Sequence, residues 1–356
     1  MSRPPRPLLW SRDRMRGLAR AVVLAILFAL INPAPAAAHI AGSGGSPSNY
    51  RTVVTAIRPA VPTVAVTVGP GGQWVRITNQ GATEIVILGY RGEPFLLLSQ
   101  DQVQVNELSS TAAETGQTRG NPAAHDPVTQ DPATGPRWVQ LRDGDSATWT
   151  DARIDPPPRG DAIPAERASE SWALPLVVDG QQATVLGTRE LIPPPPTWPW
   201  VAALGLLAAA VAAIGWRQNW HRPMAAVTAA GILAFVLHLI GTGFAPQQGG
   251  PVFGWVGVGA VSAFSLLIGA VAVVSTLRRS ESAPDRLVTV GIMVLLLAAT
   301  DISVLWYSQL PFAGPAVLDR GLTVLTYATA LGLLVAGVRL IRARKSGATR
   351  SGSMSP

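Results

Sequence analysis

The sequence predicts two domains: an all-β extracytoplasmic domain, a β-sandwich of the immunoglobulin or cupredoxin type, and an all-α domain of five transmembrane helices. Hydrophobic residues make up 48% of the 356 residues and charged residues only 14%, against about 25% charged in soluble proteins. Ten short apolar segments lie between residues 50 and 191, and five long apolar runs follow residue 197. The first pattern is typical of strands and the second of membrane helices.

The charge of the chain differs from segment to segment. Residues 1–38 carry a net charge of +5, residues 39–196 carry −5, and residues 197–356 carry +7. Because the basic groups flank apolar runs, they indicate membrane topology and exclude a nucleic-acid-binding face. The chain has no cysteine, which excludes disulfides, thiolate metal sites and cysteine nucleophiles.

Residues 1–38 have the pattern of a secretory signal peptide. Six arginines come before or at the start of Ala21–Ile31, an apolar stretch of eleven residues that is too short to cross about 30 Å of hydrocarbon. Ala36-Ala37-Ala38 supplies the small residues of a cleavage site. Cleavage there makes His39 the mature N-terminus, and an uncleaved anchor is the alternative.

The extracytoplasmic domain is expected to cover residues 39–192. Alternating apolar and polar residues mark its strands, and Gly69–Gly72 and Asp179-Gly180 predict hairpin turns. The strand candidates are Tyr50–Ile57, Thr63–Val68, Trp74–Asn79, Thr83–Tyr90, Pro94–Ser99, Val103–Leu108, Arg137–Arg142, Ser146–Thr150, Trp172–Val178 and Ala183–Leu191.

Two polar segments interrupt these strands, at Ser109–Pro136 and at residues 155–170. Because they hold almost no large apolar residues, we expect both to be surface loops. Four tryptophans are the expected aromatic anchors of the core: Trp74, Trp138, Trp149 and Trp172.

The helical domain is expected at residues 198–341, after a proline-rich linker at 193–197. Arginines gather in the connections 217–223 and 278–286 and in the basic tail 342–356, whereas the connections 245–251 and 308–321 hold only Arg320. The positive-inside rule therefore predicts a multi-pass protein of the cell membrane with a cytoplasmic C-terminus. The five predicted spans are Trp198–Trp216, Met224–Phe244, Val252–Leu277, Leu287–Tyr307 and Leu322–Ile341.

His238 and Asp301 are ionisable residues inside these apolar spans, where such groups are costly. Each lies six residues before the outer end of its span, about 9 Å deep at about 1.5 Å per residue. We expect an intramembrane pair, with Tyr327 and Ser303 as supporting polar groups. The pair indicates a proton- or ion-linked site, a contact that holds helices together, or two groups that reach the interface separately.

A mature N-terminal His39 offers an α-amine and an imidazole on one residue, which together suit copper. His125 is the other histidine of the extracytoplasmic region and the second candidate metal ligand. The alternatives are that His39 is merely tolerated after the cleavage site and that the protein has no cofactor.

No enzyme signature occurs in the chain. It lacks a Walker loop, a Gly-x-Gly-x-x-Gly after a strand, a His-Glu-x-x-His and a Gly-x-Ser-x-Gly. We therefore expect no catalytic residue and a protein that is not an enzyme.

Several short motifs resemble an uncharacterised family of exported membrane proteins from high-GC bacteria. They are Ser46–Thr52 (Ser-Pro-Ser-Asn-Tyr-Arg-Thr), Ile57-Arg58-Pro59, Val61-Pro62 and Gly89–Pro94 (Gly-Tyr-Arg-Gly-Glu-Pro). The resemblance implies a loose link to copper handling, because a histidine follows the signal peptide, as His39 does. It also implies a Trp-His-Asp-His-Arg-x-His-Trp motif. The matching residues Trp149–Pro156 keep its first Trp, its Asp and its Arg but none of its three histidines, which weakens the copper hypothesis.

Three functions follow from the sequence. The favoured one is a non-enzymatic binding or assembly module held in the membrane, with an unidentified membrane or extracytoplasmic protein as partner. The second is copper binding through His39. The third is proton- or ion-linked transport through His238 and Asp301, which the absence of a visible inverted repeat weakens. The lipid bilayer is a partner in all three, and nucleic acid in none.

Overall fold

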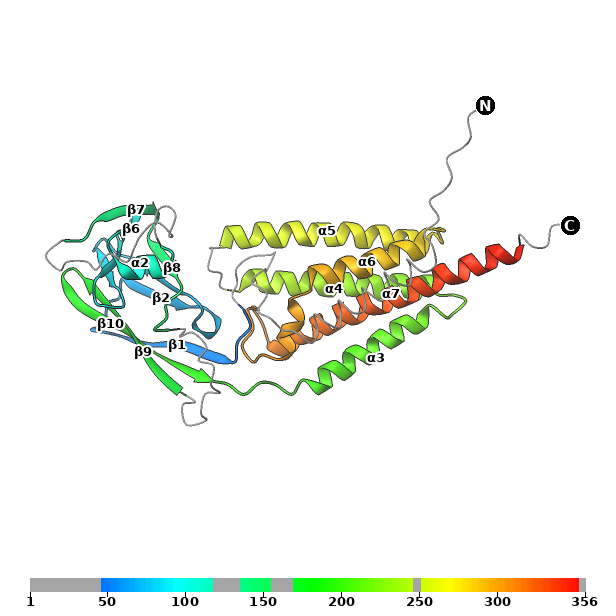
Figure 1. Ribbon diagram of the computed structural model, residues 1–356, viewed down its shortest axis with the longest axis horizontal. Coiled ribbons are helices and arrows are strands. Elements are labelled where there is room, and N and C mark those ends of the chain that lie inside the picture. Colours follow the sequence, from blue (N-terminus) through cyan, green and yellow to red (C-terminus); the bar gives the residue numbers. More distant parts are fainter. Residues whose placement is uncertain (1–45, 118–134, 155–168, 246–250, 352–356) are drawn as a thin grey trace, which may run out of the picture.

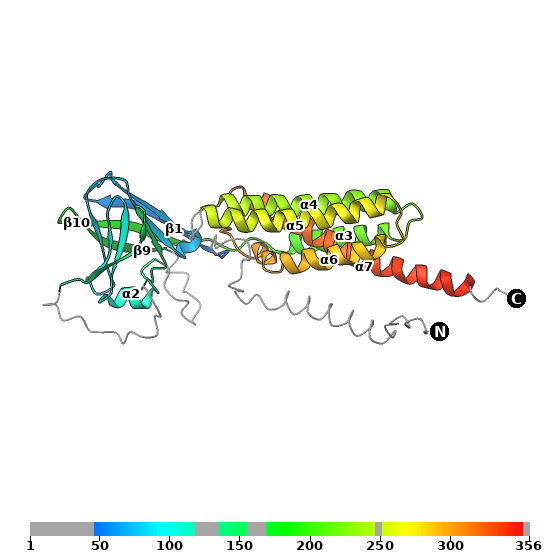
Figure 2. The same ribbon diagram turned by 90° about the horizontal axis from the view of Figure 1, so that it is seen from above.

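The computed structural model describes residues 46–117, 135–154, 169–245 and 251–351. The predicted signal peptide, His39 and His125 lie outside these residues. An antiparallel β domain occupies one end of the molecule, and helices extend from it along the long axis (Figure 1). The view from above shows the same two parts end to end (Figure 2).

All ten expected strands are present in the β domain. They form a seven-stranded sheet in the order β1-β10-β9-β4-β5-β6-β7 and a three-stranded sheet in the order β2-β3-β8. The strands are β1 (Tyr50–Arg58), β2 (Val64–Val68), β3 (Val75–Asn79), β4 (Ile85–Leu88), β5 (Pro94–Leu98), β6 (Gln102–Asn106), β7 (Trp138–Asp143), β8 (Ser146–Trp149), β9 (Ser169–Val178) and β10 (Gln181–Leu191).

The two sheets share one hydrophobic core. Ile77 of β3, Leu96 of β5 and Trp149 of β8 are 0% exposed and belong to the same apolar cluster. Trp74 and Trp172 are buried as expected. Trp138 is only half-buried, because β7 is an edge strand of the larger sheet. The immunoglobulin or cupredoxin type of this fold stays a prediction.

Both predicted hairpins form. The β2–β3 turn contains the short 3-10 helix η1 (Pro70–Gly72), with Gly71 and Gly72 at φ values of 66° and 86°. Asp179 and Gly180 join β9 to β10 at φ values of 51° and 73°. Two successive positive φ values give a two-residue turn whose twist matches that of the flanking strands.

The segment after β6 differs from the expected surface loop. Its first residues form the short helix α2 (Ser110–Glu114), in which Thr111 and Ala112 are 0% exposed. The hydroxyl of Ser109 accepts a hydrogen bond from the Ala112 backbone N–H at 3.3 Å, as an N-cap does. The prediction of a wholly exposed loop is therefore wrong for these residues, whereas residues 118–134 lie outside the description.

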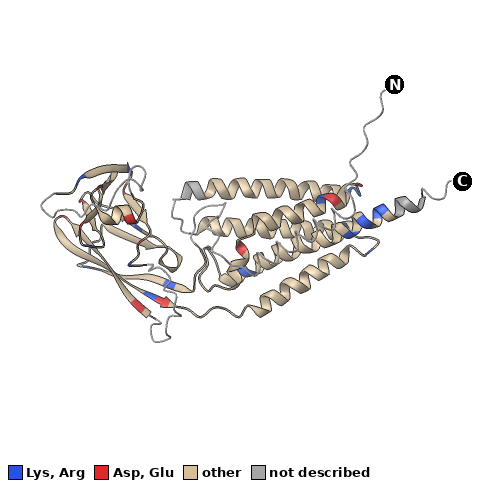
Figure 3. Ribbon diagram, in the orientation of Figure 1, with Lys and Arg blue, Asp and Glu red and all other residues tan. Residues whose placement is uncertain are grey.

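The helical part contains α3 (Trp198–Ile214), α4 (His221–Phe244), α5 (Pro251–Leu277), α6 (Ala283–Leu297), the 3-10 helix η4 (Asp301–Leu305) and α7 (Ala316–Ser351). Three helical stretches are long and apolar enough to cross a membrane: His221–Phe244, Trp255–Leu277 and Ala316–Ser346. Trp198–Ile214 is a shorter apolar helix. Charged residues lie mainly toward the two ends of the helices (Figure 3).

Two predicted spans have different boundaries in the structure. The segment Leu287–Tyr307 is not one helix, because α6 ends at Leu297 and η4 follows after a turn. The last helix starts at Ala316, six residues before the predicted Leu322. Both differences bring polar residues to the end of the helices that faces the β domain.

Helix α7 is the centre of the helical part, since it packs against α3, α4 and α6. Small residues allow the close approach. A Cβ at Gly291 of α6 would lie 2.7 Å from the Ala330 carbonyl oxygen of α7. A Cβ at Gly332 of α7 would lie 2.5 Å from Val211 of α3.

Candidate functional site

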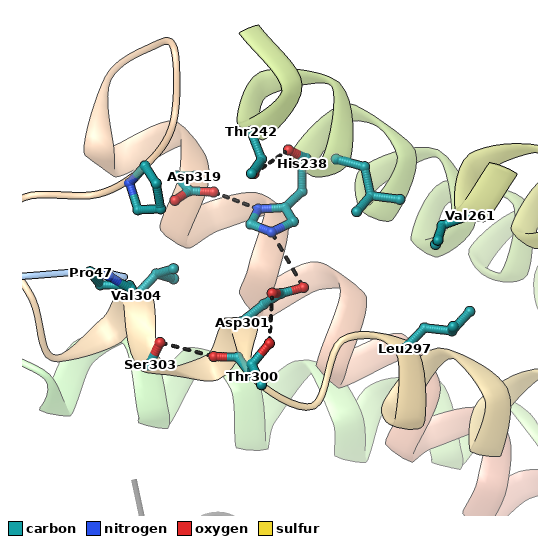
Figure 4. Close-up of a pocket in the computed structure, with 12 residues that line it drawn as sticks. Pro47, His238, Thr242, Val261, Leu297, Thr300, Asp301, Ser303, Val304 and Asp319 are labelled. Carbon is teal, nitrogen blue, oxygen red and sulfur yellow. Dashed lines mark hydrogen bonds and ion pairs between the residues drawn. The ribbon is translucent and has the colours of Figure 1, made fainter. Parts of the chain in front are cut away.

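His238 of α4 lies between two carboxylates. Its Nδ1 is 2.6 Å from Oδ1 of Asp319, and its Nε2 is 3.4 Å from Oδ2 of Asp301 (Figure 4). The side chains of His238, Asp319 and Asp301 are 7%, 1% and 12% exposed. The structure therefore brings together the expected His238–Asp301 pair and adds Asp319, which the sequence pattern places in an outer connection.

The break between α6 and η4 positions Asp301. Residues 298–300 turn the chain after α6, and Asp301 then starts η4. The hydroxyl of Tyr327 donates a hydrogen bond to the Ala298 carbonyl oxygen, which also accepts from the Asp301 backbone N–H at 2.9 Å. Tyr327 thus supports this break beside Asp301. Ser303 also acts on the backbone, since its hydroxyl donates to the Thr300 carbonyl oxygen at 2.9 Å.

The connection between η4 and α7 covers the imidazole. The ring of Phe312 lies nearly parallel to that of His238, with 6.3 Å between the ring centres and 15° between the planes. The Ala313 N–H donates to the Gly241 carbonyl oxygen at 2.9 Å. A Cβ at Gly241 would clash with the Phe312 ring, so a glycine is needed at this point of α4.

One carboxylate is hydrogen-bonded to the imidazole and the other is paired with it at 3.4 Å. A neutral imidazole has one donor and one acceptor nitrogen, whereas a carboxylate only accepts. Two facing carboxylates therefore favour an imidazolium, or a neutral ring with one protonated carboxyl. Both forms hold the same number of protons and a net charge of −1. Arg320, the next residue in α7 and only 6% exposed, supplies a positive charge to offset it.

A cavity of about 30 Å³ adjoins the cluster, and about 10–15 Å³ is enough for one water molecule. It therefore has room for water against all three ionisable groups. Its polar lining is His238, Thr242, Thr300, Asp301, Ser303 and Asp319. Pro47, from the segment that leads into the β domain, completes its wall.

The same segment joins the β domain to the helices. Ser48 forms an antiparallel bridge with Gln309, with N–H···O distances of 2.9 and 2.8 Å. The side-chain oxygen of Asn49 accepts from the N–H and the hydroxyl of Ser308 at 2.9 and 3.2 Å. We call these four residues the junction. Ser48 and Asn49 belong to the Ser-Pro-Ser-Asn-Tyr motif on which the resemblance rests.

Arg320 connects the cluster to this junction. Its Nε donates to the Val304 carbonyl oxygen at 3.1 Å, and its Nη2 donates to the Tyr307 carbonyl oxygen at 2.6 Å. Tyr307 precedes Ser308 in the chain. Hydrogen bonds and peptide bonds between neighbouring residues therefore connect the imidazole, through Asp319 and Arg320, to the β domain.

A second buried polar cluster lies inside the β domain. The Asp151 carboxylate is 0% exposed and accepts from Nε1 of Trp149 at 2.9 Å. Arg153 binds it through two nitrogens at 2.9 and 2.7 Å and donates to the Leu88 carbonyl oxygen at 3.1 Å. These are the three residues that the chain keeps of the Trp-His-Asp-His-Arg motif. Thr150 and Ala152, at two of the histidine positions, are exposed.

Glu93, in the Gly-Tyr-Arg-Gly-Glu-Pro motif, also has a structural environment. Burial raises its pKa, but hydrogen bonds from Thr111, from its own backbone N–H and from Ser109 outweigh burial, so the pKa falls from 4.5 to about 2. The Thr111 hydroxyl donates at 2.8 Å and the Ser109 hydroxyl at 3.0 Å. Glu93 therefore stays ionised at neutral pH and links β5 to α2.

The described residues hold no group of three or more His, Asp or Glu side chains that suits a metal ion. Asp301 and Asp319 lie on opposite ring nitrogens of His238, so they do not converge on one point. His39 and His125 lie outside the described residues, and copper binding through them stays a prediction.

Comparison of the chain with protein-family models, with curated proteins and with solved structures finds no match.

Proposed function

We propose that this protein is a multi-pass membrane protein in which an extracytoplasmic binding module, the β domain, docks on a protonatable site made of Asp301, His238 and Asp319. The observation that supports it best is the pair of carboxylates on the two ring nitrogens of a buried histidine, beside a cavity with room for water. No enzymatic step is part of this proposal.

The second carboxylate distinguishes a protonatable site from a simple helix contact. One carboxylate satisfies a histidine that only holds two helices together. With two, loss of the shared proton leaves a net charge of −2 on three groups that are at most 12% exposed, and the single charge of Arg320 offsets only half of it. Ionisable groups in such surroundings are costly and typical of proton relays. Water in the adjoining cavity gives the proton a way in and out.

The membrane topology is part of the proposal. Three helices have the length and hydropathy of spans, and α3 and the combined α6–η4 segment complete five crossings. The arginines near the α5–α6 turn and at the end of α7 favour a cytoplasmic location for that side. The β domain and the site then lie toward the outside.

Histidine ¹⁵N NMR on the full-length protein in lipid nanodiscs tests the proposal, with His238→Gln to assign the signal. We expect both ring nitrogens of His238 to be protonated near neutral pH, or a neutral ring together with a protonated carboxyl in the infrared spectrum. We also expect Asp319→Asn to change the signal. Asp285→Asn removes a carboxylate that is 51% exposed and serves as the control. A neutral ring between two ionised carboxylates would contradict the proposal.

A further inference from the structure

The cavity beside the histidine is covered on the side of the β domain by residues 46–49, which we call the strap. Pro47 of the strap forms part of the cavity wall (Figure 4), and so does Pro311 of the connection before α7. Pro47 precedes Ser48, and Pro311 follows Gln309 by two residues, so the two prolines flank the backbone bridge between Ser48 and Gln309. The three ionisable side chains beneath this cover are at most 12% exposed, and the site is therefore closed in this conformation.

The turn between β2 and β3 holds the strap from the β domain. The Gln73 side chain accepts from the Ser46 backbone N–H at 2.5 Å and donates to the Ser46 carbonyl oxygen at 2.6 Å. Gly71, in the same turn, has a φ of 66°, and a Cβ there would lie 2.5 Å from the Ser48 hydroxyl oxygen. The β domain therefore sets the position of the strap through one glutamine side chain and one close contact that needs a glycine.

The strap is held less firmly than the rest of the cover. None of its four residues is buried, and both hydrogen bonds between Ser46 and Gln73 lie at the exposed surface. Segments with exposed hydrogen bonds and few buried apolar contacts open locally at low cost. The helical side of the cover is firmer, because the buried Arg320 donates to the carbonyl oxygens of Val304 and Tyr307. The strap is therefore the part that can open without disturbing the helices.

We propose that the strap is a gate on the protonatable site, and that the β2–β3 turn of the β domain operates it. With Gln73 bound to Ser46, the strap closes the cavity, as in this structure. When the turn releases Ser46, Pro47 moves away and the cavity opens to the solvent around the β domain. This inference rests on the proposed function and adds the regulation of the same site.

The accessibility of a cysteine placed in the cavity wall tests the gate, since the chain has no cysteine of its own. Thr242→Cys, with Ser303→Cys as a second reporter, puts a thiol at a residue that lines the cavity. The probe is a trimethylammonium methanethiosulfonate, which does not enter lipid, and the protein is full-length in lipid nanodiscs. We expect slow labelling behind the intact strap. Gln73→Ala removes both hydrogen bonds to Ser46 and should speed labelling at least about tenfold.

Pro47→Gly, which removes the side chain over the cavity, should also speed labelling and does not depend on the folding of the Gln73 variant. Gln182→Ala is the matched control, because Gln182 is an exposed glutamine of β10, and labelling should stay slow. Gln182→Cys gives the rate of an exposed thiol.

Two results would overturn the gate: labelling of the cavity cysteines at the exposed rate behind the intact strap, or equally slow labelling with and without the Gln73 and Pro47 changes. Thiol labelling at these positions does not require a proton on His238. Failure of the gate therefore leaves the NMR signature of a protonated site in place, whereas failure of the proposed function removes that signature whatever the labelling rates are.

Discussion

Replacing Asp319 by alanine is expected to lower the free energy of unfolding of the helical part by about 3 kcal/mol, because it removes the nearer partner of a buried ion pair and leaves the imidazole only the longer contact with Asp301. Asp301→Ala should cost less. Its oxygen is 3.4 Å from the imidazole and its side chain is 12% exposed, against 2.6 Å and 1% for Asp319. The sequence indicates neither the shorter distance nor the deeper burial of Asp319.

Chemical unfolding of the full-length protein in detergent, followed by circular dichroism, measures these costs. His238→Ala combined with either aspartate variant should cost less than the sum of the single changes, as residues in contact do. Asp285→Ala, which removes an exposed carboxylate, should change the free energy of unfolding little. Strict additivity, or equal costs at Asp285 and Asp319, would show that the cluster does not act as one unit.

Asp151→Ala is expected to have the largest effect in the β domain, about 3–5 kcal/mol. The change leaves the Arg153 guanidinium and the Trp149 N–H without the carboxylate that both contact. Unfolding of the full-length protein, followed by tryptophan fluorescence, measures the loss, since Trp74, Trp149 and Trp172 are buried in the β domain. Glu190→Ala is the control: its ion pair with Arg51 has the same kind of groups at 2.6 Å but is 44–55% exposed, so it should cost at most about 1 kcal/mol. Similar costs for the two changes would contradict a structural role for the buried cluster.

The strands could be predicted because period-two alternation and turn residues both depend on local sequence. Val64–Val68 and the Asp179-Gly180 turn are examples. Helix α2 could not be predicted in the same way. It is five residues long and its burial depends on Glu93, whose carboxylate binds Ser109 and Thr111 from a distant part of the chain.

Two of the three ionisable residues of the candidate site could be predicted from the sequence. His238 and Asp301 stand out because ionisable groups interrupt apolar runs. Asp319 does not, because the polar residues before Leu322 have the composition of a connection although α7 already includes them. The sequence does not predict the end of α6 either, because Ala298-Ala299-Thr300 contains neither proline nor glycine. The Tyr327 hydroxyl contacts the end of α6 from 29 residues away along the chain, and this contact is visible only in the fold.

The junction lies beyond single-sequence reasoning altogether. Asn49 and Ser308 are separated by 259 residues, and nothing in the composition of either segment indicates the other. The resemblance that rests on the Ser-Pro-Ser-Asn-Tyr motif stays a prediction, and the contact of this motif with the helical part emerges only from the fold.

A disulfide across the junction tests most directly the claim that the β domain docks on the proton site. The chain has no cysteine, so Ser48→Cys with Gln309→Cys introduces a single pair at residues bridged in the structure, where Cα atoms about 5.5 Å apart suit a disulfide. Ser171→Cys with Thr188→Cys, a facing pair on β9 and β10, is the positive control. The account predicts that both pairs cross-link to a similar extent in folded, full-length protein, and that Asp319→Ala slows cross-linking only at the junction. Efficient cross-linking of the control pair with none between positions 48 and 309 would contradict it.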